Sequence, residues 1–154
     1  MVRGFNVMSE YFGSPEATAA AVDAEGWLHT GDIGYLRTDG YLRIVDRKKD
    51  IIIVGGFNVS PAEVEAIILR RDDVAQVAVV GVPDDRLGEV GAAFIVVRPG
   101  SSVEDEDLMA WCRDHMANYK VPRYLRSLDA LPTNSSGKIM KAVLREKAGR
   151  LRPE

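Results

Sequence analysis

The residues best suited to chemistry in this chain are three consecutive cations and one lysine in a loop of small residues. Arg47, Lys48 and Lys49 cannot all be neutralised by their immediate neighbours, so they are available to an anionic ligand or to solvent. Lys138 follows the run Ser135-Ser136-Gly137. A flexible ammonium can bridge two anions and offset their repulsion. Taken alone, however, position 138 fits a solvated surface lysine better.

A strand, a turn and a helix must position these groups, and the stretch from Asp46 to Glu65 encodes all three. Residues 51–54 form a β-branched run that predicts a strand buried on both faces. Gly55 and Gly56 permit a positive φ or a close approach to a ligand. Residues 60–63 read Ser-Pro-Ala-Glu, a capping box that predicts the start of a helix. This ordered combination favours a moving, ligand-facing segment.

At this stretch the sequence resembles the adenylate-forming enzymes, which include acyl-CoA synthetases, firefly-type luciferases and peptide-synthetase adenylation domains. It is most similar to the bacterial fatty acyl-CoA ligase branch. Three further blocks resemble family motifs in the family's order: residues 3–11 with 14–18, the TGD-containing block 26–34, and the lysine loop 131–139. The chain departs from the usual family residues at three positions, Phe5, Glu10 and Asn134, where proline, glycine and threonine are common.

The resemblance implies a two-step reaction in the parent enzyme. A carboxylate attacks the α-phosphate of ATP, which gives an acyl-adenylate and pyrophosphate, and the thiol of coenzyme A then displaces AMP. Lys138 matches the family lysine of the first step. Asp32 matches the aspartate that accepts hydrogen bonds from the ribose hydroxyls, and Arg47 matches the arginine at the ribose or phosphates. A surface ion pair of Arg47 with Asp46 or Asp50 is the alternative.

The resemblance also implies a hinge and a passage for the thiol. Lys49 falls on the family's hinge position, where a change of backbone torsions would swing the C-terminal domain between a state that presents Lys138 and one that presents the Gly55-Gly56 face. Gly56 aligns with the glycine that lines the pantetheine tunnel. A turn glycine with positive φ would be equally intolerant of substitution, so only separate half-reaction assays distinguish the two roles.

The order of elements predicts an α+β domain with a small mixed sheet flanked by helices, as in the C-terminal domain of the acyl-CoA synthetase fold. Residues 1–46 are expected to be the tail of a larger N-terminal domain, ending in a hairpin, and residues 47–154 the mobile C-terminal domain. The expected elements are a strand within 2–12, a helix over 15–22, a hairpin over 32–46 around an Asp39-Gly40 turn of primed geometry, strands over 74–82, 90–98 and 125–128, an acidic helix over 103–118 and a closing helix over 140–148.

Composition limits the classes of protein further. The formal net charge of -3 argues against a nucleic-acid or membrane-surface partner. The single cysteine, Cys112, excludes an internal disulfide and is expected in the core. No apolar run is long enough to span a bilayer and no signal peptide is evident, so a cytoplasmic protein is expected.

No metal site is expected within the chain. His29 and His115 do not suggest a metal pair, and Asp84, Asp85 and Glu89 fit solvated loop charges better than ligands. The Mg²⁺ that accompanies ATP is usually held by phosphates and water.

Three functions follow from the pattern. The leading one is the C-terminal fragment of an ATP-dependent acyl-CoA synthetase, inactive alone because the phosphate loop and acyl pocket lie in a missing N-terminal domain, its expected partner. The second is a stand-alone module that binds coenzyme A or a nucleotide. The third is the tail of an adenylation domain that acts with a carrier protein. The substrates would be ATP, coenzyme A and a small carboxylic acid, whose identity the sequence does not specify.

Overall fold

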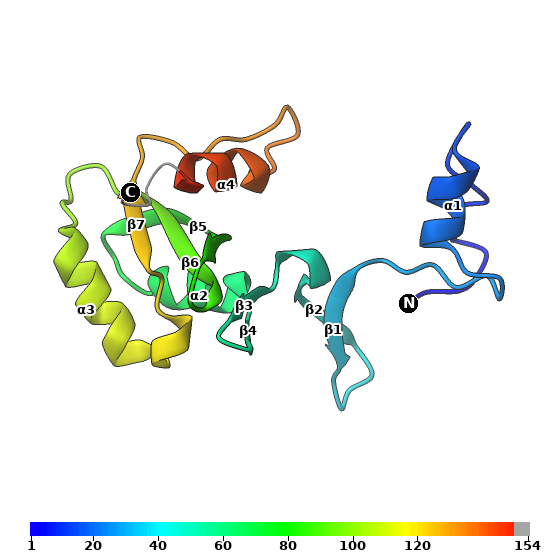
Figure 1. Ribbon diagram of the computed structural model, residues 1–154, viewed down its shortest axis with the longest axis horizontal. Helices are drawn as coiled ribbons and strands as arrows, with labels where there is room; N and C mark the ends of the chain where they lie inside the picture. Colours follow the sequence, from blue (N-terminus) through cyan, green and yellow to red (C-terminus); the bar gives the residue numbers. More distant parts are fainter. Residues whose placement is uncertain (150–154) are drawn as a thin grey trace. The chain divides into compact units, whose positions relative to one another are not determined.

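The computed structural model describes residues 1–149, which fall into two compact units that meet between Lys49 and Asp50 (Figure 1). A single 3-10 turn, η1 (Lys48–Asp50), carries the chain from one unit into the other. Each unit has its own sheet: two strands before the boundary and five after it. The boundary lies three residues beyond the one expected from the sequence, Asp46/Arg47.

The first unit consists of one short helix and one hairpin. Its elements are α1 (Pro15–Ala21), β1 (Asp32–Leu36) and β2 (Leu42–Arg47). The helix and the antiparallel hairpin occur where the sequence predicted them. Two expectations were wrong. Residues 2–12 form no strand, because Val2 makes only an isolated bridge to Leu28, and the hairpin turn is not of the primed type, because Asp39 does not adopt the positive φ that this type requires.

The second unit is built on a mixed five-stranded sheet. Its strands are β3 (Ile52–Val54), β4 (Phe57–Val59), β5 (Val74–Asp84), β6 (Gly88–Val97) and β7 (Tyr124–Ser127). The order is β4-β3-β6-β5, and β7 pairs with β6 in the parallel direction while the other pairs are antiparallel. The predicted α+β class with a small mixed sheet is confirmed. As a consequence of this order, β5 is an edge strand.

Helices cover both faces of this sheet (Figure 1). They are α2 (Pro61–Ile68), α3 (Asp105–His115) and α4 (Lys141–Gly149), with a 3-10 turn, η2 (Asn118–Lys120), after α3. Alternate residues of β5 and β6 point to opposite faces. Val79 and Ile95 pack with α2 and α3 in one core, whereas Val80 and Phe94 pack with Leu144 of α4 in a second core. The sheet therefore separates α2 and α3 from α4.

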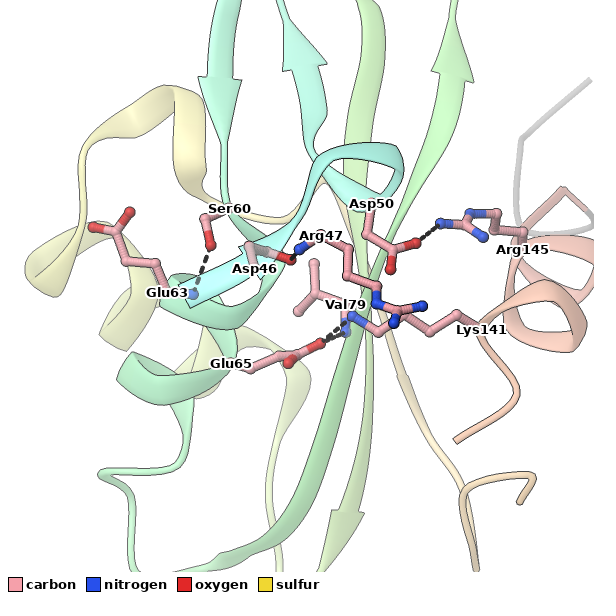
Figure 2. Close-up of polar contacts among 9 residues, drawn as sticks. All are labelled: Asp46, Arg47, Asp50, Ser60, Glu63, Glu65, Val79, Lys141 and Arg145. Atoms are coloured by element: carbon pink, nitrogen blue, oxygen red, sulfur yellow. Dashed lines mark hydrogen bonds and ion pairs between the residues drawn. The ribbon is translucent and has the colours of Figure 1, made fainter. Parts of the chain in front are cut away.

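Local chemistry explains where α2 begins. Pro61 occupies the first helical position, and the Ser60 hydroxyl accepts a hydrogen bond from the Glu63 N–H at 3.3 Å (Figure 2). The helix buries Val64, Ile67 and Ile68.

Two further expectations for the second unit were wrong: the burial of the strand over residues 51–54 and the start of the acidic helix. The run 51–54 is not buried on both faces, because the Ile53 side chain is 52% exposed while its neighbours Ile52 and Val54 are buried. The acidic helix, expected from residue 103, begins only at Asp105, and its N-cap is Glu104. Within residues 1–149, no helix has the length and apolar character needed to cross a membrane.

Candidate functional site

The hairpin of the first unit brings together the two residues predicted to hold a nucleotide. Asp32 begins β1, Arg47 ends β2, and the two are register partners. The Arg47 Nε donates to the Asp32 Oδ1 at 3.2 Å. The partner of Arg47 in this ion pair is thus neither Asp46 nor Asp50, the two alternatives that the sequence suggested. Asp46 instead accepts from the backbone N–H of Arg47 at 2.7 Å (Figure 2).

A cavity of about 510 Å³ lies beside this pair within the first unit. Its lining residues are Thr30, Gly31, Arg47, Lys48 and Lys49. The Lys48 N–H donates to the Gly31 carbonyl at 2.8 Å, which fixes the cationic run against the TGD loop. Three cations beside a carboxylate suit a polyanion that also carries hydroxyl groups, because the cations attract phosphates and the carboxylate accepts from hydroxyls.

The paired glycines form the turn between β3 and β4 in the second unit. Both have positive φ, 56° at Gly55 and 88° at Gly56, which is one of the two roles that the sequence left open for them. Their surroundings differ. A Cβ at Gly55 would meet the Leu87 side chain at 3.3 Å, whereas a Cβ at Gly56 would meet nothing within 4 Å. Gly56 therefore faces open space, and only its backbone conformation argues against a side chain there.

A second cavity, of about 490 Å³, opens beside this turn. One part of its wall is apolar and aromatic, and includes Leu87 and a stacked pair, Phe57 and Tyr119, whose ring centroids lie 4.6 Å apart. The other part is basic and contains Arg86, Arg113 and Arg123. A cavity with an apolar wall and guanidinium groups suits a ligand that joins an extended chain to phosphates. The sequence did not single out these arginines, because they lie on separate segments that only the fold brings together.

The loop that carries Lys138 is fixed by one side chain. The Asn134 Oδ1 accepts hydrogen bonds from the Ser136 N–H, the Ser136 hydroxyl and the Lys138 N–H at 2.8–3.1 Å. The backbone of Asn134 also pairs with that of Lys138 at 2.9 Å, and Gly137 has a φ of 78°. Asparagine in the usual place of threonine therefore orders the loop. Within residues 1–149 the Lys138 ammonium makes no hydrogen bond or ion pair.

The lysine loop and the glycine turn belong to the same unit but lie apart from each other. In Figure 1 the loop precedes α4, whereas the turn lies between β3 and β4. Lys138 does not line the cavity beside Gly55. The second unit therefore carries two separate candidate surfaces, one with the Lys138 ammonium, which bonds to no described residue, and one with a glycine turn.

Other conspicuous residues have structural roles. Cys112 is buried in the core, as expected, and burial raises the pKa of its thiol, which disfavours the nucleophilic thiolate. Asp84 accepts from the N–H groups of Leu87 and Arg86, which hold the pKa of its carboxyl below its usual value and form the β5–β6 turn. In the part of the chain that the structure describes, no three histidine, cysteine or acidic side chains gather as a metal site.

Comparison with known proteins identifies a family for part of the second unit. Residues 63–138 match the AMP-binding enzyme C-terminal domain. A CoA ligase of Rhodococcus jostii, named for a propanoyl group that carries a methyl-dioxo-octahydroindenyl ring system, is 56% identical over 146 residues, which are 95% of this chain and 28% of that protein. A feruloyl-CoA synthase of Amycolatopsis is 48% identical over 97% of this chain and 30% of that protein.

A solved structure agrees with these relatives. ATP-bound MatB from Rhodopseudomonas palustris matches with a TM-score of 0.89 at 33% identity, over 98% of this chain and 32% of that one. The chain thus spans about 30% of the length of the relatives that it matches. The matched residues are those of an AMP-binding enzyme C-terminal domain, and the fold is similar to that of ATP-bound MatB. Specifically, residues 63–138 of this chain belong to the AMP-binding enzyme C-terminal domain family.

Proposed function

We propose that this chain is the mobile C-terminal part of an ATP-dependent acyl-CoA synthetase. It would act together with the N-terminal domain of the same enzyme. The observation that carries the proposal is the pairing of two surfaces on one unit: a pre-ordered loop with the free Lys138 ammonium, and a glycine turn beside a basic and apolar cavity. Each surface suits one half of the reaction, so the unit can serve both only if it presents them in turn.

In the first half-reaction, a carboxylate oxygen attacks the α-phosphorus of ATP, and the bond to the pyrophosphate leaving group breaks. Lys138 would lie between the two anions and stabilise the charge that develops on the phosphoryl oxygens. Asp32 would accept hydrogen bonds from the ribose hydroxyls. Arg47, whose guanidinium already contacts the Asp32 carboxylate, would hold the ribose or a phosphate. Mg²⁺ would arrive with the nucleotide, held by its phosphates and water.

In the second half-reaction, the thiol of coenzyme A attacks the acyl carbon and AMP leaves. Coenzyme A combines an extended pantetheine chain with phosphates, which matches the two parts of the wall of the cavity beside Gly55. Gly56 would allow the pantetheine to pass, since no atom lies within 4 Å of the position of its missing Cβ. Lys49 is the proposed hinge, and it is the last residue before the boundary between the two units.

The acid that is activated is best sought among the acids named in the relatives. Those names include the octahydroindenyl propanoyl group, a feruloyl group and 2-succinylbenzoate. A panel of these acids with medium- and long-chain fatty acids, assayed with the full-length enzyme for coenzyme A-dependent release of AMP, would identify the substrate class.

Two substitutions in the full-length enzyme test the division of labour. Lys138→Ala should lower the rate of adenylation about 10²- to 10³-fold, because one charge-stabilising donor is removed, while a supplied acyl-adenylate still reacts with coenzyme A. Gly56→Leu should show the opposite pattern. Gly100→Leu is the matched control, because Gly100 also has a positive φ, 82°, and open space at its Cβ position but lies between β6 and α3, away from the glycine turn between β3 and β4.

Three results would count against the proposal. Equal loss of both half-reactions in Lys138→Ala would contradict the assigned role of the ammonium. Normal thioester formation in Gly56→Leu would remove the tunnel assignment. A comparable loss of thioester formation in Gly100→Leu would show that backbone strain, and not obstruction, explains the Gly56 result.

A further inference from the structure

The edge of the sheet in the second unit carries a polar junction that joins three elements. β5 is an edge strand, so the N–H groups on its outer side have no partner strand. The N–H of Val79 is one of these, and it donates to the Glu65 Oε1 at 2.8 Å (Figure 2). The same carboxylate oxygen accepts from the Lys141 ammonium at 3.0 Å. One side chain of α2 therefore contacts both β5 and α4.

This junction crosses from one face of the sheet to the other. Glu65 belongs to α2, which shares a core with α3, whereas Lys141 begins α4, which packs on the opposite face. Both side chains are mostly buried, 21% exposed at Glu65 and 23% at Lys141. Ion pairs that are partly withdrawn from solvent hold their geometry better than exposed ones, because water and salt screen them less.

A second ion pair lies one turn further along α4. Arg145 is four residues after Lys141, so both side chains project from the same side of the helix. The Arg145 Nη2 donates to the Asp50 Oδ1 at 2.7 Å, and the Asp50 side chain is 14% exposed (Figure 2). Asp50 is the first residue of the second unit and directly follows Lys49. The two pairs thus tie the first two turns of α4 to the body of the unit and to the point where that unit begins.

The lysine loop is rigidly joined to this helix. Lys138 stands three residues before Lys141, the Met140 N–H donates to the Pro132 carbonyl at 2.8 Å, and the Asn134 side chain holds the loop between them. A displacement of α4 would therefore also displace the Lys138 ammonium. Displacement of a catalytic group by about 1 Å can lower a rate by about 10²-fold.

We infer that Glu65 and Asp50 are positioning residues for Lys138. Through Lys141 and Arg145 they hold α4, and hence the lysine loop, in a fixed place relative to the residue after the hinge, so that a rotation at Lys49 delivers the ammonium to one defined point. This inference rests on the proposed function. A purely stabilising role would affect both half-reactions, whereas a positioning role should affect adenylation and spare thioester formation.

The test compares carboxylate-to-amide changes in the full-length enzyme. Glu65→Gln should lower the kcat of adenylation by about tenfold or more, with the KM values for ATP and acid changed less than about twofold, because binding is intact and only orientation is lost. Thioester formation from a supplied acyl-adenylate should stay within about twofold of the wild-type rate. Asp73→Asn is the matched control, because Asp73 is 22% exposed and its ion-pair partner is Arg71, which is not part of α4.

A second pair of variants keeps the inference testable if Glu65→Gln does not fold. Lys141→Met removes the cation but leaves the bond between Glu65 and Val79, and it should reproduce the loss in adenylation. Lys141→Arg should restore the rate, since a guanidinium can reach the same carboxylate. In hydrogen-exchange measurements on the full-length protein, the amides of residues 134–144 should exchange faster in Lys141→Met than in Lys141→Arg.

The outcomes separate this inference from the proposed function. If Lys138→Ala abolishes adenylation but Glu65→Gln and Lys141→Met do not lower it more than Asp73→Asn does, the positioning role is wrong and the function stands. Equal losses in both half-reactions, accompanied by a lower thermal midpoint, would show that the pairs only stabilise the fold. If Lys138→Ala leaves adenylation unchanged, the proposed function itself fails.

Discussion

The two units of this chain differ in how they are held together. In residues 1–49 no side chain is buried, and the apolar residues of the hairpin are exposed: Ile33, Tyr35, Leu36, Leu42 and Ile44. In the described residues from Asp50 on, the sheet carries two apolar cores, one on each face. The second unit has the interior of an independent domain, whereas the first is held by hydrogen bonds and exposed ion pairs, which contribute little net stability without burial.

This difference indicates what each unit depends on. A hairpin with so many exposed apolar side chains needs another surface to cover them, because isolated two-stranded hairpins are at best marginally stable in water. Under the proposed function, that surface belongs to the rest of the enzyme. The second unit, in contrast, is expected to keep its structure while it moves as a body.

The largest expected effect follows from the cores. Phe94→Ala should lower the free energy of unfolding of the second unit by about 3–5 kcal/mol, because a fully buried ring is replaced by a cavity. Leu36→Ala, at a side chain that is exposed in the first unit, should change the free energy of unfolding by about 0.5 kcal/mol or less. Denaturant unfolding of the 154-residue chain measures each effect with the tryptophan of the same unit: Trp111 fluorescence in a Trp27→Phe background for Phe94→Ala, and Trp27 fluorescence in a Trp111→Phe background for Leu36→Ala. Similar losses in the two variants would refute the contrast between the units.

The next effect concerns ligand binding by the first unit. Arg47→Met in the full-length enzyme should raise the activation free energy that corresponds to kcat/KM for ATP by about 1.5–3 kcal/mol. This is the range for hydrogen bonds to charged groups. This is a loss of roughly tenfold to hundredfold in kcat/KM for ATP. Arg37→Met is the control, because Arg37 forms an ion pair with Asp39 at 2.8 Å near the other end of the same hairpin. If both variants lose activity equally, the hairpin fold matters and the Arg47 guanidinium does not.

A smaller effect is expected at the junction of the units. Lys49→Pro restricts the backbone torsions of the proposed hinge and should slow thioester formation by about 1 kcal/mol or more in activation free energy, roughly fivefold. Lys49→Ala keeps these torsions free and should leave both half-reactions close to wild type. Single-turnover assays that start from the acyl-adenylate isolate this step. An unaltered second step in Lys49→Pro would mean that rotation occurs elsewhere.

The smallest effect compares the helix caps of the two units. Ser60→Ala should destabilise the second unit by about 1 kcal/mol, because the Ser60 hydroxyl accepts from the Glu63 N–H. Ser14→Ala should have little effect, because the Ser14 side chain makes no such capping bond to α1. Thermal unfolding of the two variants measures the difference. A larger loss in Ser14→Ala than in Ser60→Ala would contradict the cap geometry.

Sequence reasoning succeeded where the determinant is local. The capping box at residues 60–63 predicted the start of α2, because the bond that it forms spans only three residues. The positive φ values of Gly55 and Gly56 followed from the absence of a Cβ. The motifs also assigned Asp32 and Arg47 to one ligand, but their pairing in the hairpin depends on a register shift between Ile33 and Gly34 that the sequence did not predict.

The errors arose where burial depends on the rest of the fold. Ile53 carries the same side chain as Ile52, yet one is exposed and the other buried, since helices cover only one face of the sheet at β3. No sequence pattern indicates which face a short strand will bury when both faces are apolar. The role of Glu65 was missed for a similar reason. Its partners, Val79 and Lys141, are distant in sequence and meet only because β5 is an edge strand.

The position of Glu65 has one more consequence, for the behaviour of the molecule in a crowded solution. An outer strand with free amide groups is a template on which a strand of another molecule can be added, and such additions lead to aggregation. At Val79 this template is interrupted, because the amide is already engaged and a carboxylate with its attached lysine stands in front of it. The junction that fixes α4 is therefore also a barrier against unwanted self-association along β5.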